Sequence, residues 1–190
     1  MKLEDFRYKI QNSFFSFEDL LKFYPDEKIN TLKTQIYRWI KKGKIFRLKR
    51  GFYLIKKEGL NLYFVANILY QPSYISLESA LFYYGIIPDI PFVTTSITTI
   101  TKKEIKTIVG RFIYRKISVN LYFGFEKIKI GDEFVQMAYK EKAILDYLYI
   151  YKFKRIDDLR IDWQKFDKSK LNEFSKNYPV WVQKLVCEAV

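Results

Sequence analysis

Apolar and polar residues alternate with two different periods along this chain, and the periods predict which segments are helical. Near the N-terminus, apolar residues recur every three to four positions, which is the repeat of an amphipathic helix. Ser16 followed by Asp19 has the spacing of a capping box, so we expect Ser16 to cap one of these helices. Three helices are predicted, over Leu3–Ile10, within Ser13–Pro25, and from Asp26–Asn30 to Lys42.

The third of these helices has two contrasting faces. At 100° per residue, its apolar side chains fall within a stripe of about 100°. That stripe contains Ile29, Leu32, Ile36, Trp39 and Ile40. The opposite face contains Asn30, Thr34, Tyr37, Arg38 and Lys41, with Lys33 on its flank. Arginine can donate two hydrogen bonds to guanine and asparagine can pair with adenine, so this face is suited to reading base edges.

A β-hairpin is expected directly after the third helix. Ile45–Leu48 and Phe52–Ile55 alternate as strands do, and Gly51 between them supplies the positive φ that a tight turn needs. Arg47 and Lys49 are predicted on one face of the first strand. Three helices followed by a basic hairpin is the element order of a winged helix-turn-helix, which binds duplex DNA.

Positive charge is concentrated in this same region. The chain has 34 Lys and Arg against 21 Asp and Glu, a net charge of +13. Eleven of the cations lie between Lys28 and Lys57, where there is no acidic residue. This distribution predicts double-stranded DNA as a partner. The candidate DNA contacts are Asn30, Lys33, Thr34, Tyr37, Arg38, Lys41, Arg47, Lys49 and Arg50. We place a winged helix-turn-helix domain at residues 1–58.

Residues 59–190 predict a larger mixed α+β domain, because helices and strands follow one another there without regular alternation. The expected helices are Leu60–Tyr70, Leu77–Tyr84 with Ser76 as its cap, Glu141–Lys152, Lys168–Lys176 and Val180–Glu188. The expected strands are Phe92–Ile100, Gly110–Ile117, Leu121–Ile130 and Phe134–Ala138. On one of these strands, Arg111, Arg115 and Lys116 form a possible second basic surface. It would extend the DNA footprint or face a different partner.

Composition argues against a catalytic or metal site. There is no histidine, and the one cysteine, Cys187, cannot form an internal disulfide. Glu141 and Asp146 lie about 140° apart on a helix and would not converge. Asp157-Asp158 with Asp162 is more typical of solvated turns than of a cation site. We therefore predict a cytoplasmic protein that is not an enzyme, with no catalytic residue, metal, cofactor or membrane association.

Three segments follow one another in a recognisable order: Leu32–Tyr53, Tyr74–Pro88 and Glu141–Asp146, with the expected strands Val93–Thr95 and Gly110–Tyr114 between the last two. Together they resemble the AbiEi-type antitoxins of abortive-infection (type IV) toxin–antitoxin systems. The likeness covers roughly Leu32 to Ile150. Three positions depart from the family: Trp39 stands where leucine is usual, Tyr84 where histidine is frequent, and Ala138-Tyr139-Lys140 replaces a Thr/Ser-Pro lead.

The resemblance implies a DNA-binding repressor of its own operon that is also the antitoxin. Its first domain would bind operator DNA at inverted repeats. Its second would counter a nucleotidyltransferase toxin without a stable complex between the two. Two alternatives stay open. One is a stand-alone winged-helix regulator with no toxin partner, and the less favoured one is an enzyme that processes nucleic acid.

Overall fold

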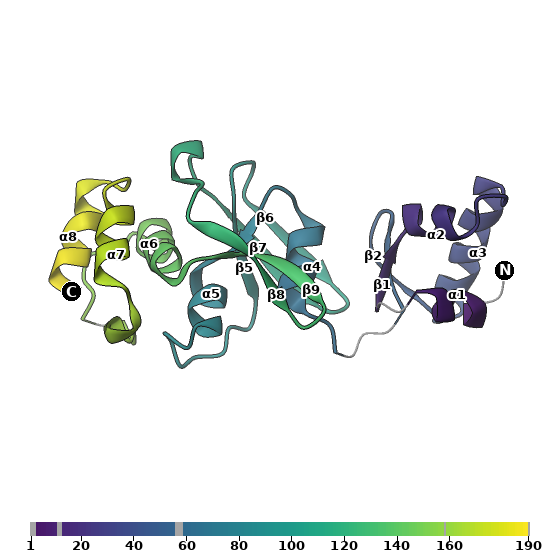
Figure 1. Cartoon of the computed structure of the whole chain (residues 1–190), viewed down its shortest axis with the longest axis horizontal. Helices are drawn as coiled ribbons and strands as arrows, with labels where there is room; N and C mark the ends of the chain where they lie inside the picture. The colour runs from purple at the N-terminus through teal and green to yellow at the C-terminus, as the bar shows by residue number, and fades with distance from the viewer. Residues whose placement is uncertain (1–2, 11–12, 56–58, 158, 190) are drawn as a thin grey trace. The chain divides into compact units, whose positions relative to one another are not determined.

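Two compact units make up the chain, an N-terminal unit of residues 1–60 and a C-terminal unit of residues 61–190. The computed structural model describes residues 3–10, 13–55, 59–157 and 159–189 (Figure 1). The boundary predicted after residue 58 falls outside these ranges. Within them, eight α-helices accompany two β-sheets, which confirms the α+β class. None of the helices in these ranges is long and apolar enough to cross a membrane.

The N-terminal unit contains three helices and a three-stranded antiparallel sheet. The helices are α1 (Leu3–Lys9), α2 (Phe17–Phe23) and α3 (Ile29–Lys41). The strands are β1 (Phe14–Ser16), β2 (Phe46–Lys49) and β3 (Phe52–Leu54), in the order β1-β3-β2. The predicted hairpin and the first and third helices are confirmed. The second predicted helix is confirmed after its cap Ser16, but the residues before it, Phe14–Ser16, pair with β3 as a strand that was not predicted.

The capping box at the start of α2 is present as predicted. The Asp19 backbone N–H donates to the Ser16 hydroxyl at 3.1 Å, and the Ser16 backbone N–H donates to the Asp19 carboxylate at 2.8 Å. This reciprocal pair satisfies two donors that a helix start leaves open. The switch from strand to helix at Ser16 is therefore encoded locally.

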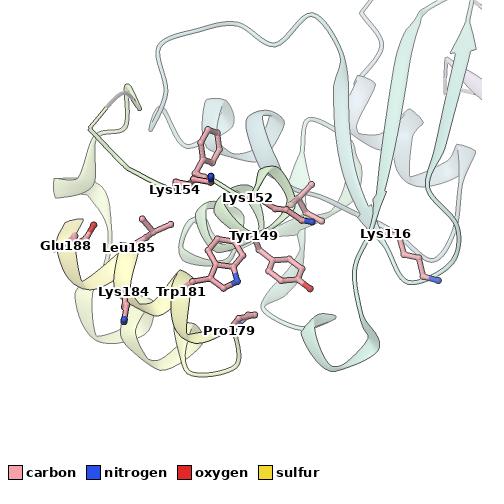
Figure 2. Close-up of a pocket in the computed structure, with 11 residues that line it drawn as sticks. Lys116, Tyr149, Lys152, Lys154, Pro179, Trp181, Lys184, Leu185 and Glu188 are labelled. Carbon is pink, nitrogen blue, oxygen red and sulfur yellow. The ribbon is translucent and has the colours of Figure 1, made fainter.

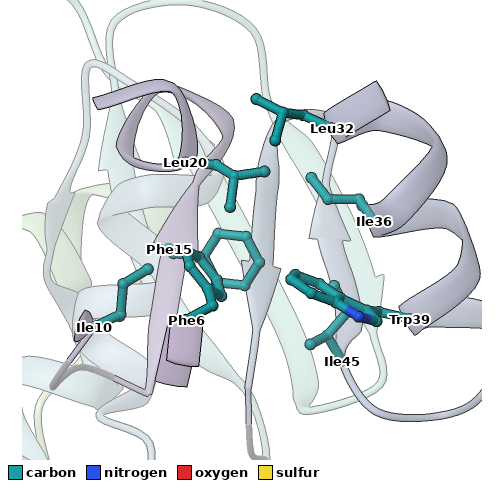
Figure 3. Packing of buried hydrophobic residues seen from close by; sticks show 8 residues of the cluster. All are labelled: Phe6, Ile10, Phe15, Leu20, Leu32, Ile36, Trp39 and Ile45. Atoms are coloured by element: carbon teal, nitrogen blue, oxygen red, sulfur yellow. The ribbon is translucent and has the colours of Figure 1, made fainter. Parts of the chain in front are cut away.

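The core of the N-terminal unit joins its helices to its sheet (Figure 3). Its buried members are Phe6, Ile10, Phe15, Leu20, Leu32, Ile36, Trp39 and Ile45. The ring of Phe6 stacks on Trp39 at 5.6 Å between centroids and meets Phe15 edge-on at 4.7 Å. The apolar stripe of α3 is narrower than predicted: Ile29, the first residue of the helix, is 51% exposed, and Ile40 is half-buried.

The C-terminal unit is built on a six-stranded mixed sheet, in the order β6-β7-β5-β4-β9-β8. Its strands are β4 (Tyr74–Ile75), β5 (Thr94–Thr98), β6 (Lys103–Thr107), β7 (Gly110–Lys116), β8 (Phe125–Ile130) and β9 (Glu133–Ala138). The β4–β9 and β5–β7 pairs are parallel, and the others are antiparallel. Strands β4 and β6 were not expected from the sequence.

Five helices accompany this sheet: α4 (Leu62–Leu69), α5 (Leu77–Tyr83), α6 (Lys140–Tyr151), α7 (Lys168–Ser175) and α8 (Val180–Ala189). Short 3-10 turns occur at Val119–Leu121 and Trp163–Lys165. Helices α4 and α6 cover opposite faces. The Tyr114 hydroxyl donates to the Ala66 carbonyl of α4 at 2.7 Å, whereas the guanidinium of the next residue, Arg115, lies 5.9 Å from the Tyr151 ring of α6. Helices α7 and α8 lie beyond α6 from the sheet (Figure 1).

Candidate nucleic-acid interface

Helix α3 and the β2–β3 hairpin enclose one groove of about 430 Å³. Lys33 and Tyr37 reach it from α3, and Arg47 and Arg50 reach it from the hairpin. Its other lining residues are Phe17, Ile36, Ile40, Gly51 and Tyr53, so no acidic side chain lines it. Tyr37 is 63% exposed. Four of the predicted DNA contacts therefore lie around a single groove.

Backbone pairing fixes the hairpin wall of this groove. Arg47 lies opposite Tyr53, and the register shifts between Arg47 and Lys49, which is a bulge in β2. Gly51 has a φ of +82°, a conformation that L side chains rarely adopt. The Gly51 carbonyl accepts a hydrogen bond from the Phe17 backbone N–H at 2.8 Å. The turn that presents Arg50 is thus tied to the first residue of α2.

The groove cations face no acidic partner. In the described ranges, no carboxylate lies within 4.0 Å of Lys33, Arg47 or Arg50. The ion pair found in the described part of the N-terminal unit is Lys44–Glu4, at 3.9 Å. Lys49 is in a different environment. Its ammonium lies 4.6 Å from the centre of the Phe52 ring, and burial lowers its pKa. An acid-free set of exposed cations attracts phosphate, because nothing nearby offsets the charge.

The remaining predicted contacts lie on α3 outside the groove. Asn30, Thr34, Arg38 and Lys41 are exposed and do not line it. The Thr34 hydroxyl donates to the Asn30 carbonyl one turn back, at 2.8 Å. The groove is lined by the side of α3 that carries the half-buried Ile40. These four residues lie on the neighbouring, solvent-facing side of the helix. Their DNA contacts stay predictions.

The three basic residues predicted as a second surface have three different environments. Arg111 donates two hydrogen bonds, at 2.8 and 3.0 Å, to the carboxylate of Glu104 on the neighbouring strand β6. Arg115 lies against the Tyr151 ring, at 5.9 Å from its centre. Lys116 lines a separate pocket near α8. The structure therefore does not bring them together as one basic patch.

A buried polar network in the C-terminal unit was not foreseen from the sequence. The ammonium of Lys142 pairs with the carboxylate of Asp146, and both side chains are fully buried. That carboxylate also accepts hydrogen bonds from the hydroxyls of Tyr178 at 2.7 Å, Ser76 at 2.8 Å and Tyr74 at 2.9 Å. Burial lowers the pKa of Lys142, and Asp146 opposes that shift. Burial also raises the pKa of both tyrosines.

This network explains one departure from the sequence expectations. Ser76 precedes α5 but makes no side-chain cap, because its hydroxyl is bonded to Asp146. Glu141 is also buried, and its carboxylate accepts from the Asp167 backbone N–H at 3.1 Å, so the two acids of α6 have different partners and do not converge, as the sequence predicts. Leu185 and Val186 beside Cys187 predict a core position for it, but Cys187 is exposed.

In the described part of the chain, no group of three or more His, Cys, Asp or Glu side chains has the arrangement of a metal site. Of the acidic turn considered above, Asp158 lies outside the described residues. Comparison with known protein families gives no match, and comparison with curated proteins gives none either.

Proposed function

We propose that the N-terminal unit binds duplex DNA as a winged helix-turn-helix. The observation that carries the proposal is the acid-free groove in which Lys33 and Tyr37 of α3 lie beside Arg47 and Arg50 of the hairpin. In this arrangement α3 enters the major groove, and the hairpin contacts the adjacent backbone or minor groove.

The predicted contacts on α3 and on the hairpin fall into two sets with separate roles in this proposal. Lys33, Arg47 and Arg50 bind phosphates and hold the register of the protein on the duplex. Arg38, with Asn30, Thr34 and Tyr37, is exposed and reads base edges, whereas Lys41 contacts phosphate. Phosphate contacts weaken with salt on every sequence, whereas base contacts discriminate between sequences.

We further propose that the chain represses its own operon and is the antitoxin of a nucleotidyltransferase toxin. The support is the ordered resemblance to AbiEi-type antitoxins. Two of the departures from that family are in mutual contact: the Tyr84 hydroxyl donates to the Ala138 carbonyl at 3.0 Å. A third, Trp39, fills the core against Phe6. The unusual residues are therefore accommodated by the fold.

Footprinting on the DNA upstream of the chain's own gene tests the repressor part. We expect protection of two inverted half-sites whose centres are separated by about 10 base pairs or a multiple of it. If the protein retards no duplex in a gel-shift assay at moderate salt, DNA binding is contradicted. Co-expression with a nucleotidyltransferase toxin tests the antitoxin part, with restored growth as the expected result. A footprint without rescue identifies a stand-alone regulator.

The enzymatic alternative is tested by incubating the protein with labelled RNA and DNA in the presence of Mg²⁺ or Mn²⁺. We expect no turnover. Turnover that a single carboxylate substitution abolishes contradicts the proposal, since metal-assisted chemistry on nucleic acid requires carboxylate ligands.

A further inference from the structure

A second basic pocket lies in the C-terminal unit, where the end of α6 meets α8 (Figure 2). It has a volume of about 870 Å³, which is within the usual range for a ligand site. Its lining residues are Lys116, Tyr149, Ile150, Lys152, Phe153, Lys154, Pro179, Trp181, Lys184, Leu185 and Glu188. It shares no residue with the groove of the N-terminal unit.

The pocket carries a surplus of positive charge. Four lysines and one glutamate line it, which gives 4 − 1 = +3. Lys116, Lys152, Lys154 and Lys184 come from the end of β7, the end of α6, the segment after it, and α8. They are exposed, and none has a carboxylate within 4.0 Å among the residues that the structure describes. Such unpaired cations favour an anionic ligand.

Two aromatic rings form a platform in this pocket. Trp181 and Tyr149 stack with 6.1 Å between centroids and 17° between planes, and Trp181 is 38% exposed. Tyr149 meets Tyr178 edge-on at 5.7 Å, and Tyr178 is hydrogen-bonded to the buried carboxylate of Asp146. The buried network therefore helps to hold the platform in place.

We propose that this pocket binds single-stranded nucleic acid, with a base stacked on Trp181 and phosphates held by the lysines. Stacked aromatic rings with surrounding cations are the combination by which proteins bind unpaired strands. A duplex does not fit this arrangement, because its base faces are covered by neighbouring base pairs. Figure 2 shows Lys116 and Lys184 on opposite sides of the two rings. That spread suits successive phosphates along a strand better than the phosphates of one free nucleotide.

The test uses the full chain with its N-terminal groove neutralised by Lys33→Ala, Arg47→Ala and Arg50→Ala, so that binding there does not mask the pocket. Ten-residue oligouridylate and oligothymidylate are titrated while tryptophan fluorescence and the anisotropy of a labelled strand are recorded. We expect a stacked base to quench Trp181. Trp181→Ala weakens binding by about tenfold or more, whereas Trp181→Phe keeps most of the affinity and loses the quenching.

The lysines are tested separately, so that a folding defect at Trp181 does not leave the proposal undecided. Lys152→Glu with Lys184→Glu should weaken binding more than tenfold and lower the salt slope by about 1.4, which corresponds to two single-strand contacts. Lys102→Glu with Lys129→Glu is the charge-matched control, because both lysines are exposed elsewhere in the same unit. The control should bind as the parent does.

Three results overturn the proposal: neither strand binds, the control pair loses as much affinity as the pocket pair, or uridine monophosphate binds as tightly as the strand. A preference for oligouridylate supports it and identifies RNA as the ligand. Equal binding of the two strands supports it and shows that the sugar is not read.

Discussion

The basic residues around the groove of the N-terminal unit differ from several basic residues of the C-terminal unit in whether the fold pairs them. In the N-terminal unit the cations around the groove are exposed, and none has a carboxylate partner in the described ranges. In the C-terminal unit several are engaged within the fold. Lys142 is buried against Asp146, Arg111 is paired with Glu104, and the Lys170 ammonium lies 3.3 Å from the centre of the Tyr139 ring.

This difference shows that net charge alone is a poor guide to a partner. The +13 of the whole chain includes cations that hold the C-terminal fold together and cations that nothing in the fold uses. A free cation stays available to phosphate, whereas a paired one has its field cancelled nearby. The position of the counter-charges therefore distinguishes the binding surface from the structural one.

The largest effect is expected where a buried pair is broken. Lys142→Met leaves the Asp146 carboxylate buried without its cation, which should destabilise the C-terminal unit by about 3–5 kcal/mol. Urea unfolding followed by tryptophan fluorescence measures the loss. Duplex binding by the N-terminal unit should be retained under native conditions.

Lys129→Met is the matched control, because Lys129 is exposed on β8. It should change the free energy of unfolding by no more than about 0.5 kcal/mol. Equal effects of the two substitutions would show that the Lys142–Asp146 pair does not stabilise the unit.

Alkaline pH should also affect the stability of the two units differently. Burial raises the pKa of Tyr74 and Tyr178 well above the usual 10.0, so folding disfavours their ionised forms. The stability that these hydroxyls contribute is fully present below pH 10 and is lost as the pH rises above it. Lys142 acts with the opposite sign, since burial lowers its pKa.

We expect the C-terminal unit to unfold first as the pH rises above 10, because its core contains these two hydroxyls whereas the buried cluster of the N-terminal unit is apolar. Circular dichroism recorded together with tyrosinate absorbance follows the transition. Tyr74→Phe should shift it to higher pH. Earlier unfolding of the N-terminal unit would contradict this expectation.

Local signals in the sequence predicted much of the fold. The Ser16–Asp19 spacing, the turn at Gly51 and the helical repeat of α3 each depend on neighbours within a few residues, and all three are present. Strand β1 was missed, because Phe14–Ser16 becomes a strand only by pairing with β3 some forty residues later. Strand β6 was missed because its Lys and Glu residues have low strand propensity and suit an exposed edge.

The residues of the candidate sites were also predicted to different degrees, because sequence patterns report contacts between near neighbours and not between distant segments. Lys33 and Tyr37 lie on one helix and Arg47 and Arg50 on the next hairpin, so short-range patterns placed them close together. Lys142 and Asp146 have the spacing of an ordinary exposed helix pair. Their burial depends on Tyr74 and Tyr178, which are distant in sequence. Hydrogen bonds between residues so far apart in the chain leave no periodic pattern in the sequence.

A smaller effect is expected at Arg38. Arg38→Ala should weaken binding to a selected operator by about 1–3 kcal/mol, because a bidentate contact to guanine discriminates by that amount. Binding to random duplex should change much less. Lys33→Ala should instead weaken both equally. Competition assays with the two duplexes give the ratio of operator affinity to random-duplex affinity. If Arg38→Ala lowers both affinities equally, base reading by this residue is excluded.

The smallest effect is expected at Arg111. Its pair with Glu104 is exposed and screened by solvent, so Arg111→Ala should leave duplex affinity unchanged and lower the melting temperature only slightly. Anisotropy and thermal unfolding are the measurements. A loss of affinity as large as that of Arg47→Ala would mean that β7 belongs to the DNA interface, and the contrast between the units would not hold.

The most direct test of the central claim is the salt dependence of duplex binding. The variant with Lys33→Ala, Arg47→Ala and Arg50→Ala is compared with a charge-matched variant with Lys102→Ala, Lys129→Ala and Lys176→Ala, whose lysines are exposed in the C-terminal unit. If the groove of α3 and the hairpin holds the duplex, its loss lowers the slope of log affinity against log salt by about 2.7, or three contacts, and the matched variant keeps the parent slope. Equal slopes for the two variants would contradict the claim.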